Sequence, residues 1–245
     1  MPMVPVSLSR DGALSGPAPA RRFGRTGVRP AWRGFECCGV RPVPFCGIMC
    51  GMTAAHSHGG RSHTGRLLVA TPVLTDPNFA RAVVLLLDHD AEGALGVVLN
   101  RPTPVEVGSV LDGWGRLVGQ PAVVFQGGPV ALDSALGLAV APGEPGSGEP
   151  LGWRRVHGAI GLVDLEAPPE VLAGELGSLR IFAGYAGWSP GQLEAELESG
   201  AWYLVDCEPG DVSSPEPERL WRSVLRRQRG PLALLATYPD DPTMN

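Results

Sequence analysis

The chain has 245 residues, of which 44% are hydrophobic and 18% charged, so it can build a core and is too apolar to be disordered throughout. All 20 basic residues are arginine, and the lack of lysine excludes a Schiff base to pyridoxal phosphate, a Walker A phosphate loop and a lysine general base. Residues 1–51 carry seven arginines against Asp11 and Glu36, a net of +5, and because the whole chain carries −5, residues 52–245 must carry −10. This acidic balance argues against a broad phosphate-binding face.

The apolar runs are too short for a membrane span, which needs about 18 residues. Arg21 and Arg22 suggest a twin-arginine export signal, but no apolar segment follows them, so secretion is not expected. We therefore expect a cytoplasmic protein with a soluble core and no contact with a membrane.

The first 64 residues lack hydrophobic periodicity and are rich in Arg, Gly, Pro and Ser, which predicts a disordered extension before a folded domain at residues 65–245. Met49 and Met52 lie close to the start of that domain. We therefore hypothesise that translation begins at one of them rather than at Met1, which N-terminal sequencing of the native protein would decide.

Most of the potential metal ligands of the cysteine and histidine type lie in or next to this extension. They are Cys37, Cys38, Cys46, Cys50, His56, His58 and His63. The cysteine spacing does not match two Cys-x-x-Cys pairs, and the histidines are interpreted as solvated tail residues, so neither a metal site nor a cofactor is expected. The fifth cysteine, Cys207, is interpreted as an unreactive strand residue.

The longest apolar runs lie between residues 65 and 102 and predict the centre of the fold. Residues 67–70 and 82–87 are expected to be buried strands, and Thr-Asp-Pro-Asn at 75–78 predicts a turn between them. A polar loop that ends at Gly93 joins the second strand to residues 94–99, which predicts a β-hairpin with Gly93 at positive φ.

The remaining elements alternate between short helices and short strands. Helices are predicted at 103–112, 168–176 and 189–200 and from a cap at 213–216, and strands at 122–126, 136–140, 153–156, 160–163, 179–183, 202–205 and 232–236. Gly-Gly-Pro at 127–129 is expected to be a tight turn. This mixed order indicates an α+β fold rather than regular βαβ winding.

Three separated segments resemble the bacterial AlgH/YqgE family. They are LLVATPVLTDPNFARAVVLLLDHDAEGALGVVLNRP at 67–102, FQGGPV at 125–130 and GYAGWSPGQLEAEL at 184–197. The resemblance implies an α+β domain in which a largely antiparallel, branched sheet curls into a partial barrel with short helices packed outside. It implies little about activity, because the family's label of transcriptional regulator has no clear mechanism attached.

This chain departs from the family pattern in two places. The segment at 131–140, ALDSALGLAV, is less polar than is usual after the Gly-Gly-Pro-Val motif. Most members also begin near the equivalent of Gly65, so the N-terminal extension is additional.

Five polar residues at the ends of the predicted central strands form the first candidate ligand site. They are Asp76, Asn78, His89, Asn100 and Arg101. Such a set could bind a small anion or a metal ion, because polar loops at strand ends often build sites. The structural alternative is that Asp76 caps a turn, His89 lies in a solvated loop, and Asn100 and Arg101 tie strand ends to neighbouring backbone.

The segment Gly187–Gly191 matches the G-x-S-x-G pattern of a hydrolase nucleophile elbow. That elbow needs the N–H of the residue after the serine, and Pro190 has none. Ser189 is therefore expected to cap a helix. Trp188 and Gln192, with Glu194 and Glu196, could line a pocket or a partner surface, or could pack and cap that helix instead.

The last predicted helix carries the basic patch of the folded part. Arg219, Arg222 and Arg226 are the candidate nucleic-acid contacts, although they could equally stabilise the end of the helix. We expect a non-catalytic protein that binds an unidentified protein or small molecule. The alternatives are a transcriptional regulator, acting directly or indirectly on DNA, and a hydrolase or metal-dependent enzyme that uses Asp76, His89 and Asn100.

Overall fold

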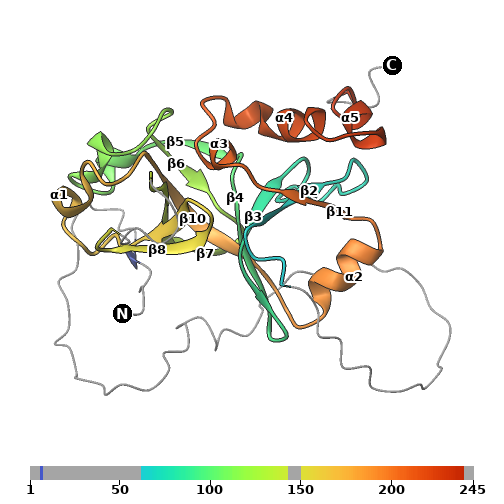
Figure 1. Ribbon diagram of the computed structural model, residues 1–245, viewed down its shortest axis with the longest axis horizontal. Coiled ribbons are helices and arrows are strands. Elements are labelled where there is room, and N and C mark those ends of the chain that lie inside the picture. The colour runs from blue at the N-terminus through green and yellow to red at the C-terminus, as the bar shows by residue number, and fades with distance from the viewer. Residues whose placement is uncertain (1–5, 8–61, 143–149, 240–245) are drawn as a thin grey trace.

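The computed structural model describes residues 6–7, 62–142 and 150–239 (Figure 1). The strands are β1 (Val6–Ser7), β2 (Arg66–Ala70), β3 (Val83–Asp90), β4 (Gly93–Val98), β5 (Pro102–Glu106), β6 (Val123–Gln126), β7 (Val130–Val140), β8 (Trp153–His157), β9 (Ile160–Val163), β10 (Ser178–Trp188) and β11 (Trp202–Asp206). The α-helices are α1 (Pro169–Leu172), α2 (Gln192–Glu198), α3 (Pro209–Val212), α4 (Leu220–Arg226) and α5 (Pro231–Leu235). Apart from residues 6–7 and 62–64, the predicted N-terminal extension and its cysteines lie outside the described residues.

The strands form one branched, largely antiparallel sheet that curls into a half-barrel, with short helices on its outside. Its main path runs β11-β2-β3-β4-β10-β7-β9-β8, and β6 branches from β10 and pairs with β5. The β6–β10 pairing is parallel, whereas the ladders of the main path are antiparallel. The predicted α+β class and the curled, branched sheet are confirmed.

Strand β10 belongs to both halves of this sheet. Its first part, residues 178–185, pairs with β7, and its last three residues pair with β4. A bulge between Ala183 and Tyr185 separates the two parts, and Gly184 there has φ +71°. Glycine is the residue that adopts this left-handed conformation without strain, so the strand can change direction here.

Two of the three chain segments that meet at this bend have glycine there, at Gly127–Gly128 and at Gly184. The amide of Gly127 donates to Ala183 O at 2.8 Å, and Gly127 O accepts from Val98 N at 2.7 Å. A Cβ atom on Gly128 would lie 2.1 Å from the carbonyl carbon of Tyr185. Residues 127–128, predicted to be a tight turn, thus join β6 to both β4 and β10.

The β3–β4 hairpin lies at the centre of the fold, as predicted. Asp90 pairs with Gly93 across the turn, and Gly93 has φ +129°. Leu85 and Val97 face each other across the ladder and are fully buried. Because both faces of this part of the sheet are covered, the strands read as continuous apolar runs rather than alternating ones.

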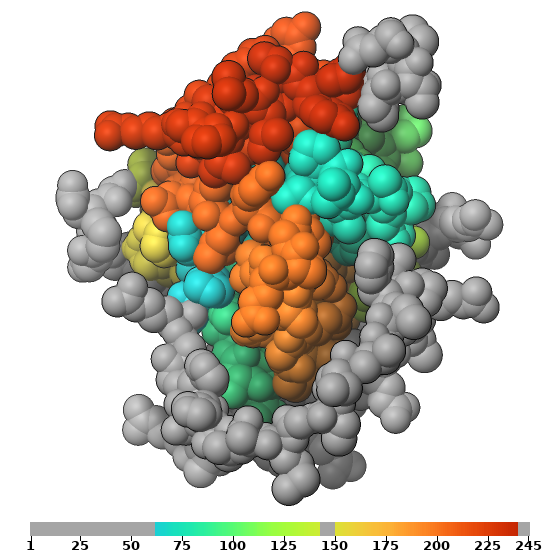
Figure 2. Space-filling view, turned by 90° about the vertical axis from the view of Figure 1, so that its right-hand side faces the viewer, coloured from blue at the N-terminus to red at the C-terminus, as the bar shows by residue number. Residues whose placement is uncertain are grey.

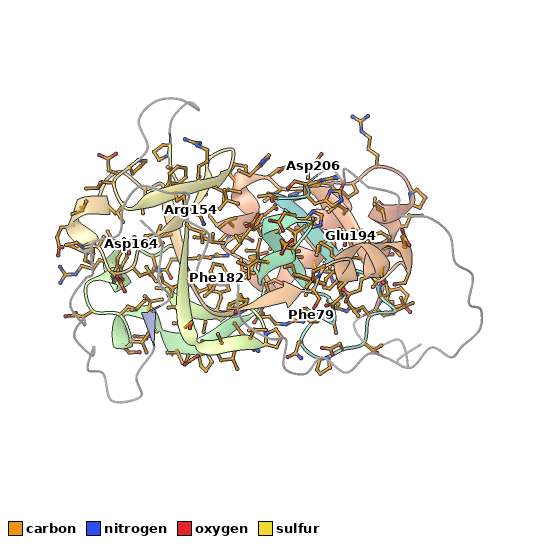
Figure 3. The ribbon with its side chains drawn as sticks, turned by 90° about the horizontal axis from the view of Figure 1, so that it is seen from below. Phe79, Arg154, Asp164, Phe182, Glu194 and Asp206 are labelled. Carbon is orange, nitrogen blue, oxygen red and sulfur yellow. The ribbon has the colours of Figure 1, made fainter. Side chains whose placement is uncertain are left out.

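Helices cover the two faces of the β2–β3–β11 part from opposite sides (Figure 1). On one face, α4 packs its apolar stripe onto alternate strand residues, and Trp221 Nε1 donates to Ala70 O at 2.8 Å. On the other face, α2 and the loop before β3 cover Leu68, Val84 and Leu86. A further core, which includes Trp114 and Ile181, fills the other half of the sheet. Phe182 of β10 packs on Phe125 at 5.6 Å between ring centroids and lies between the two halves (Figure 3).

Two predicted elements are wrong. Residues 103–112 were expected to be helical, but β5 occupies 102–106 and only 107–109 form a 3-10 turn. Pro102 and Pro104 disfavour helical conformation in the residues before them, and the Thr103 hydroxyl donates to Val124 O at 2.7 Å, which favours the sheet. Residues 232–236 were expected to be a strand but lie largely in α5, where Pro231 occupies the first helical turn.

Other predictions missed only in their boundaries. β7 begins six residues before the expected strand, and α1 covers only the first half of its predicted helix. The cap expected at 213–216 is not the start of α4, which follows a 3-10 turn at Pro217–Arg219. A capping box exists on α3 instead, where Glu208 N donates to Asp211 Oδ2 at 2.7 Å.

The close backbone approach at Gly128 predicts the effect of adding a side chain there. Gly128→Ala should reduce the free energy of unfolding by roughly 2–4 kcal/mol, because the added methyl group would overlap the backbone of Tyr185. Urea unfolding of both proteins measures the loss.

The matched control is Gly210→Ala in α3, where a Cβ atom meets nothing within 4 Å. Its free energy of unfolding should change by no more than about 1 kcal/mol. If both substitutions lowered the free energy of unfolding equally, the lack of space at Gly128 would not be the cause.

Candidate functional site

One carboxylate fastens helix α2 to the sheet. Glu196 accepts hydrogen bonds from Trp188 Nε1 at 2.9 Å, from Trp202 Nε1 at 2.8 Å and from Gln192 Nε2 at 2.9 Å. The two indoles lie edge to face, 6.2 Å between centroids, and Phe79 packs beside both. Figure 2 shows α2 in orange on this face, next to the loop of residues 71–81. The structure therefore brings Trp188 and Gln192 together through Glu196, in a packed arrangement.

Helix α2 begins at Gln192, three residues after Ser189. Ser189 was expected to cap this helix, but the N-cap residue is Gly191 and, within the described residues, no side-chain hydrogen bond caps the helix. The Gln192 side chain instead accepts from Ser189 N at 3.1 Å. Gly191, with φ +75°, lies at the start of the helix. The Gly187–Gly191 segment is thus a strand-to-helix connection whose polar groups bond to α2.

His89, which was proposed as a ligand-binding residue in a polar loop, is 7% exposed and bonds at both ring nitrogens. Its Nδ1 accepts from His63 N at 3.1 Å, and its Nε2 lies 2.8 Å from Glu194 Oε1. Because an acceptor Nδ1 carries no proton, the neutral ring must hold its proton on Nε2 and donate it to Glu194. No lone pair of the ring is left for a substrate in this arrangement, which does not suit a general base.

His63 stacks on His89 with 5.0 Å between ring centroids and 13° between ring planes. The structure thus corrects the interpretation of His63 as a solvated tail residue. Burial, followed by the nearby His89 and Arg66, lowers the pKa of His63. For Glu194, burial alone would raise the pKa, but hydrogen bonds from its own helix backbone and from His89 together with the imidazole charges lower it. Glu194 lies on the α2 side of the molecule (Figure 3).

A second group of predicted site residues forms hydrogen bonds with the backbone of the loop between β2 and β3. Asn100 is 3% exposed, accepts from Val83 N at 2.9 Å and donates to Arg81 O at 2.9 Å. Arg101 donates to Ala80 O, and burial lowers its pKa. At the other end of the loop, Asp76 Oδ1 accepts from the amide of Asn78 at 2.8 Å.

The structure does not join these two groups into one site. Asn100 bonds to the first residue of β3 and His89 lies six residues further along that strand, which corresponds to roughly 20 Å. Asn100 and Arg101 therefore bond to the end of the loop that leads into β3, apart from His89, and Asp76 and Asn78 form a separate turn within that loop. No group of three histidine, cysteine or acidic residues placed to hold a metal ion occurs within residues 62–142 and 150–239.

Most of the arginines in and beside α4 form hydrogen bonds or ion pairs within the molecule. Arg219 pairs with Glu216 at 3.4 Å, and Arg222 donates to Ala236 O at 2.7 Å. Arg227 forms a two-point pair with Asp211 at 2.5 and 2.7 Å, and the hydrogen bonds to Asp211 raise its pKa. Arg226 is exposed in the last turn. The predicted basic patch is therefore reduced by internal pairs.

A groove that the sequence analysis missed lies between β5 and the segment before α4, with a volume of about 660 Å³. Its lining consists of Pro102, Thr103, Pro104, Pro121, Val123, Pro215, Glu216, Pro217, Glu218 and Arg219. The signal that could have found it is the repeated Pro-x-Pro spacing at 102–104 and 215–217, which favours extended, rigid backbone.

Arg180 of β10 ties the two walls of this groove together from beneath. Its guanidinium donates to Gln120 O at 3.1 Å and to Ser214 O, each the residue before a lining proline. The side chain stacks on Phe125 at 4.6 Å and is 2% exposed, and burial lowers its pKa to about 10. It stays charged at neutral pH and fixes the spacing of the walls from inside.

Comparison with known proteins gives consistent matches. The family model described as AlgH-like matches residues 67–233. A UPF0301 protein of Streptomyces avermitilis is 74% identical over 198 residues, which is 80% of this chain and 100% of that protein, and one of Mycobacterium tuberculosis is 46% identical over 186 residues, 76% of this chain and 92% of that protein.

Two solved structures share the fold. A crystal structure of a Corynebacterium diphtheriae protein has a TM-score of 0.67 and 34% identity, covering 71% of this chain and 92% of that one. The solution structure of the AlgH protein of Pseudomonas aeruginosa has a TM-score of 0.51 and 29% identity, covering 78% of this chain and 100% of that one. Within the described residues, no helix has the length and apolar character required to cross a membrane.

The paired histidines predict a pH dependence of stability. The folded state holds the pKa of His63 below 6.5 and that of Glu194 below 4.5, so the unfolded chain binds more protons as the pH falls. The free energy of unfolding should therefore be highest above about pH 6.5 and decrease towards pH 4. Urea unfolding of the wild type and of His63→Ala across this range tests it, and the decrease around pH 6 should be smaller in the variant. An identical slope in both proteins would contradict the assignment.

Cys207 should be unreactive in the folded protein. Burial, followed by the Asp211 carboxylate, raises the pKa of its thiol to about 12. At about pH 8, alkylation of Cys207 by iodoacetamide should be at least ~100-fold slower than that of an ordinary exposed thiol. Peptide mass spectrometry after a timed reaction measures this, with protein in concentrated urea as the control. Rapid native labelling would contradict it.

Proposed function

The chain belongs to the AlgH-like family, and on that premise we propose that it is a non-catalytic binding protein that engages a partner protein through the groove between β5 and the segment before α4. The groove itself carries this proposal. A volume of about 660 Å³ bordered by five prolines gives a preformed concave surface whose backbone has little freedom to lose on binding.

The framework around the groove supports a preorganised surface. Arg180 links the carbonyls of Gln120 and Ser214 beneath it, and Thr103 bonds to Val124 O on the β5 side. A surface that is already ordered binds with a smaller entropy cost than one that must order on contact. The cytoplasm, expected from the sequence, is the compartment we propose for this binding.

The state of the candidate catalytic residues favours binding over hydrolysis. Both ring nitrogens of His89 and both polar ends of Asn100 are occupied by internal hydrogen bonds. A hydrolase or metal-dependent enzyme based on Asp76, His89 and Asn100 would have to bring together groups at opposite ends of β3.

The use of the α4 arginines favours a protein partner over DNA. Affinity for DNA depends mainly on cations free to contact phosphates. Arg222 donates to Ala236 O, and the chain beyond residue 51 carries −10. Any effect on transcription is therefore proposed to be indirect, through the bound protein.

The proposal is tested by site-specific crosslinking in the native host. A photoreactive amino acid at Val123, which lines the groove, should give a discrete crosslinked adduct with another protein on gel electrophoresis. The control places the same amino acid at Leu151, which is 79% exposed and away from the groove lining. Adducts that are absent, or identical at both positions, would contradict a groove-directed partner.

A further inference from the structure

We infer that the groove accepts an extended, positively charged segment of its partner, with arginine or lysine side chains directed at Glu216 and Glu218. This inference rests on the proposed function, because it names the chemistry of the partner that the groove would bind. It follows from the balance of hydrogen-bond donors and acceptors in the lining, and from the charge of the surface around it.

The lining of the groove is rich in acceptors. Five of its ten residues are prolines, which have no N–H to offer, although the carbonyls of Pro121 and Pro217 already accept from backbone amides. Glu216 and Glu218 add two carboxylates, which act only as acceptors when ionised. A ligand that satisfies this surface must therefore bring donors.

The side-chain donors of the lining are few, and each of these side chains already makes an internal hydrogen bond. The Thr103 hydroxyl donates to Val124 O at 2.7 Å, and the Arg219 guanidinium donates to Glu216 at 3.4 Å. Arg180 is buried beneath the walls and donates inward to their carbonyls, so it acts as a positioning residue and not as a contact. An acidic ligand would be repelled by the carboxylates of Glu216 and Glu218 and would find few hydrogen-bond donors.

The acidic side chains can respond to an incoming cation. The side chains of Glu216 and Arg219 are 65% and 74% exposed, and an ion pair this open to solvent contributes little to stability. A guanidinium on the partner could therefore displace Arg219 from Glu216 at small cost. The charge of −10 on residues 52–245 would also attract a basic segment from a distance.

The walls favour an extended segment over a compact one. Pyrrolidine rings give rigid apolar faces along which the aliphatic stems of arginine or lysine can pack. Strand β5 pairs only with β6 among the described strands, and Pro102 and Pro104 lack the amides with which an added β-strand would pair. The partner is thus held mainly by side chains and by its donors to carbonyls.

The test uses the full chain and three labelled peptides in fluorescence anisotropy. The peptides share one frame of about nine residues, in which proline and valine alternate with a variable position that is arginine, glutamine or glutamate. At about 0.15 M salt the arginine peptide should bind at least ~10-fold more tightly than the glutamine peptide, and the glutamate peptide should bind least.

Matched variants locate the binding. Glu216→Gln with Glu218→Gln should weaken the arginine peptide at least ~10-fold. The control, Glu175→Gln with Glu198→Gln, removes the same charge from exposed residues outside the groove and should leave its affinity unchanged within about twofold. Equal weakening by both double variants, or no binding of the arginine peptide, would overturn the inference.

The two proposals can fail separately. Tighter binding of the glutamate peptide, combined with crosslinking at Val123, would overturn the basic-segment inference and leave the groove as the binding surface. If the arginine peptide bound equally well to the groove variants, it would be binding outside the groove, and the inference would be overturned. Absence of crosslinking at Val123 would count against the proposed function itself, whatever the peptides show.

Discussion

The whole sheet depends on a backbone crossing that has no room for side chains. At Gly127, Gly128 and Gly184 two segments approach so closely that a Cβ atom at any of these glycines would lie within 3 Å of a neighbouring backbone atom. This contact lets β10 leave one half of the sheet and join the other. Strand β10 contributes side chains to both cores, Phe182 to one and Ile181 to the other.

The same strand sets the positions of both surface features described above. Arg180, near the start of β10, lies beneath the proline-walled groove, and Trp188, at its end, receives helix α2 through Glu196. Eight residues of β10 separate them, and because the strand bends at Gly184 the distance is at most roughly 27 Å. The groove and the α2 face are therefore held at a fixed spacing, although neither touches the other.

The sequence predicted the central hairpin well because its strands are continuous apolar runs and its turn needs a glycine, so local pattern and tertiary role agree. It failed at 103–112, where a capping pattern competed with prolines and with a hydroxyl bond to Val124 O that only the tertiary fold supplies. Family resemblance, and not periodicity, supplied the partial barrel. Gly127 and Gly128 were read as a local turn because the strand they approach lies more than 50 residues away.

The candidate site was less accessible to sequence reasoning. The contact of Gln192 with Glu196 follows from helical spacing. The bond between His89 and Glu194, however, spans 105 residues, and the groove joins segments more than 90 residues apart. The bend in β10 also limits how this gene could be rearranged. Since one uninterrupted strand closes both halves, neither half can be exchanged by recombination or expressed as a separate module without losing its closing strand. The domain must therefore be inherited, and lost, as a unit.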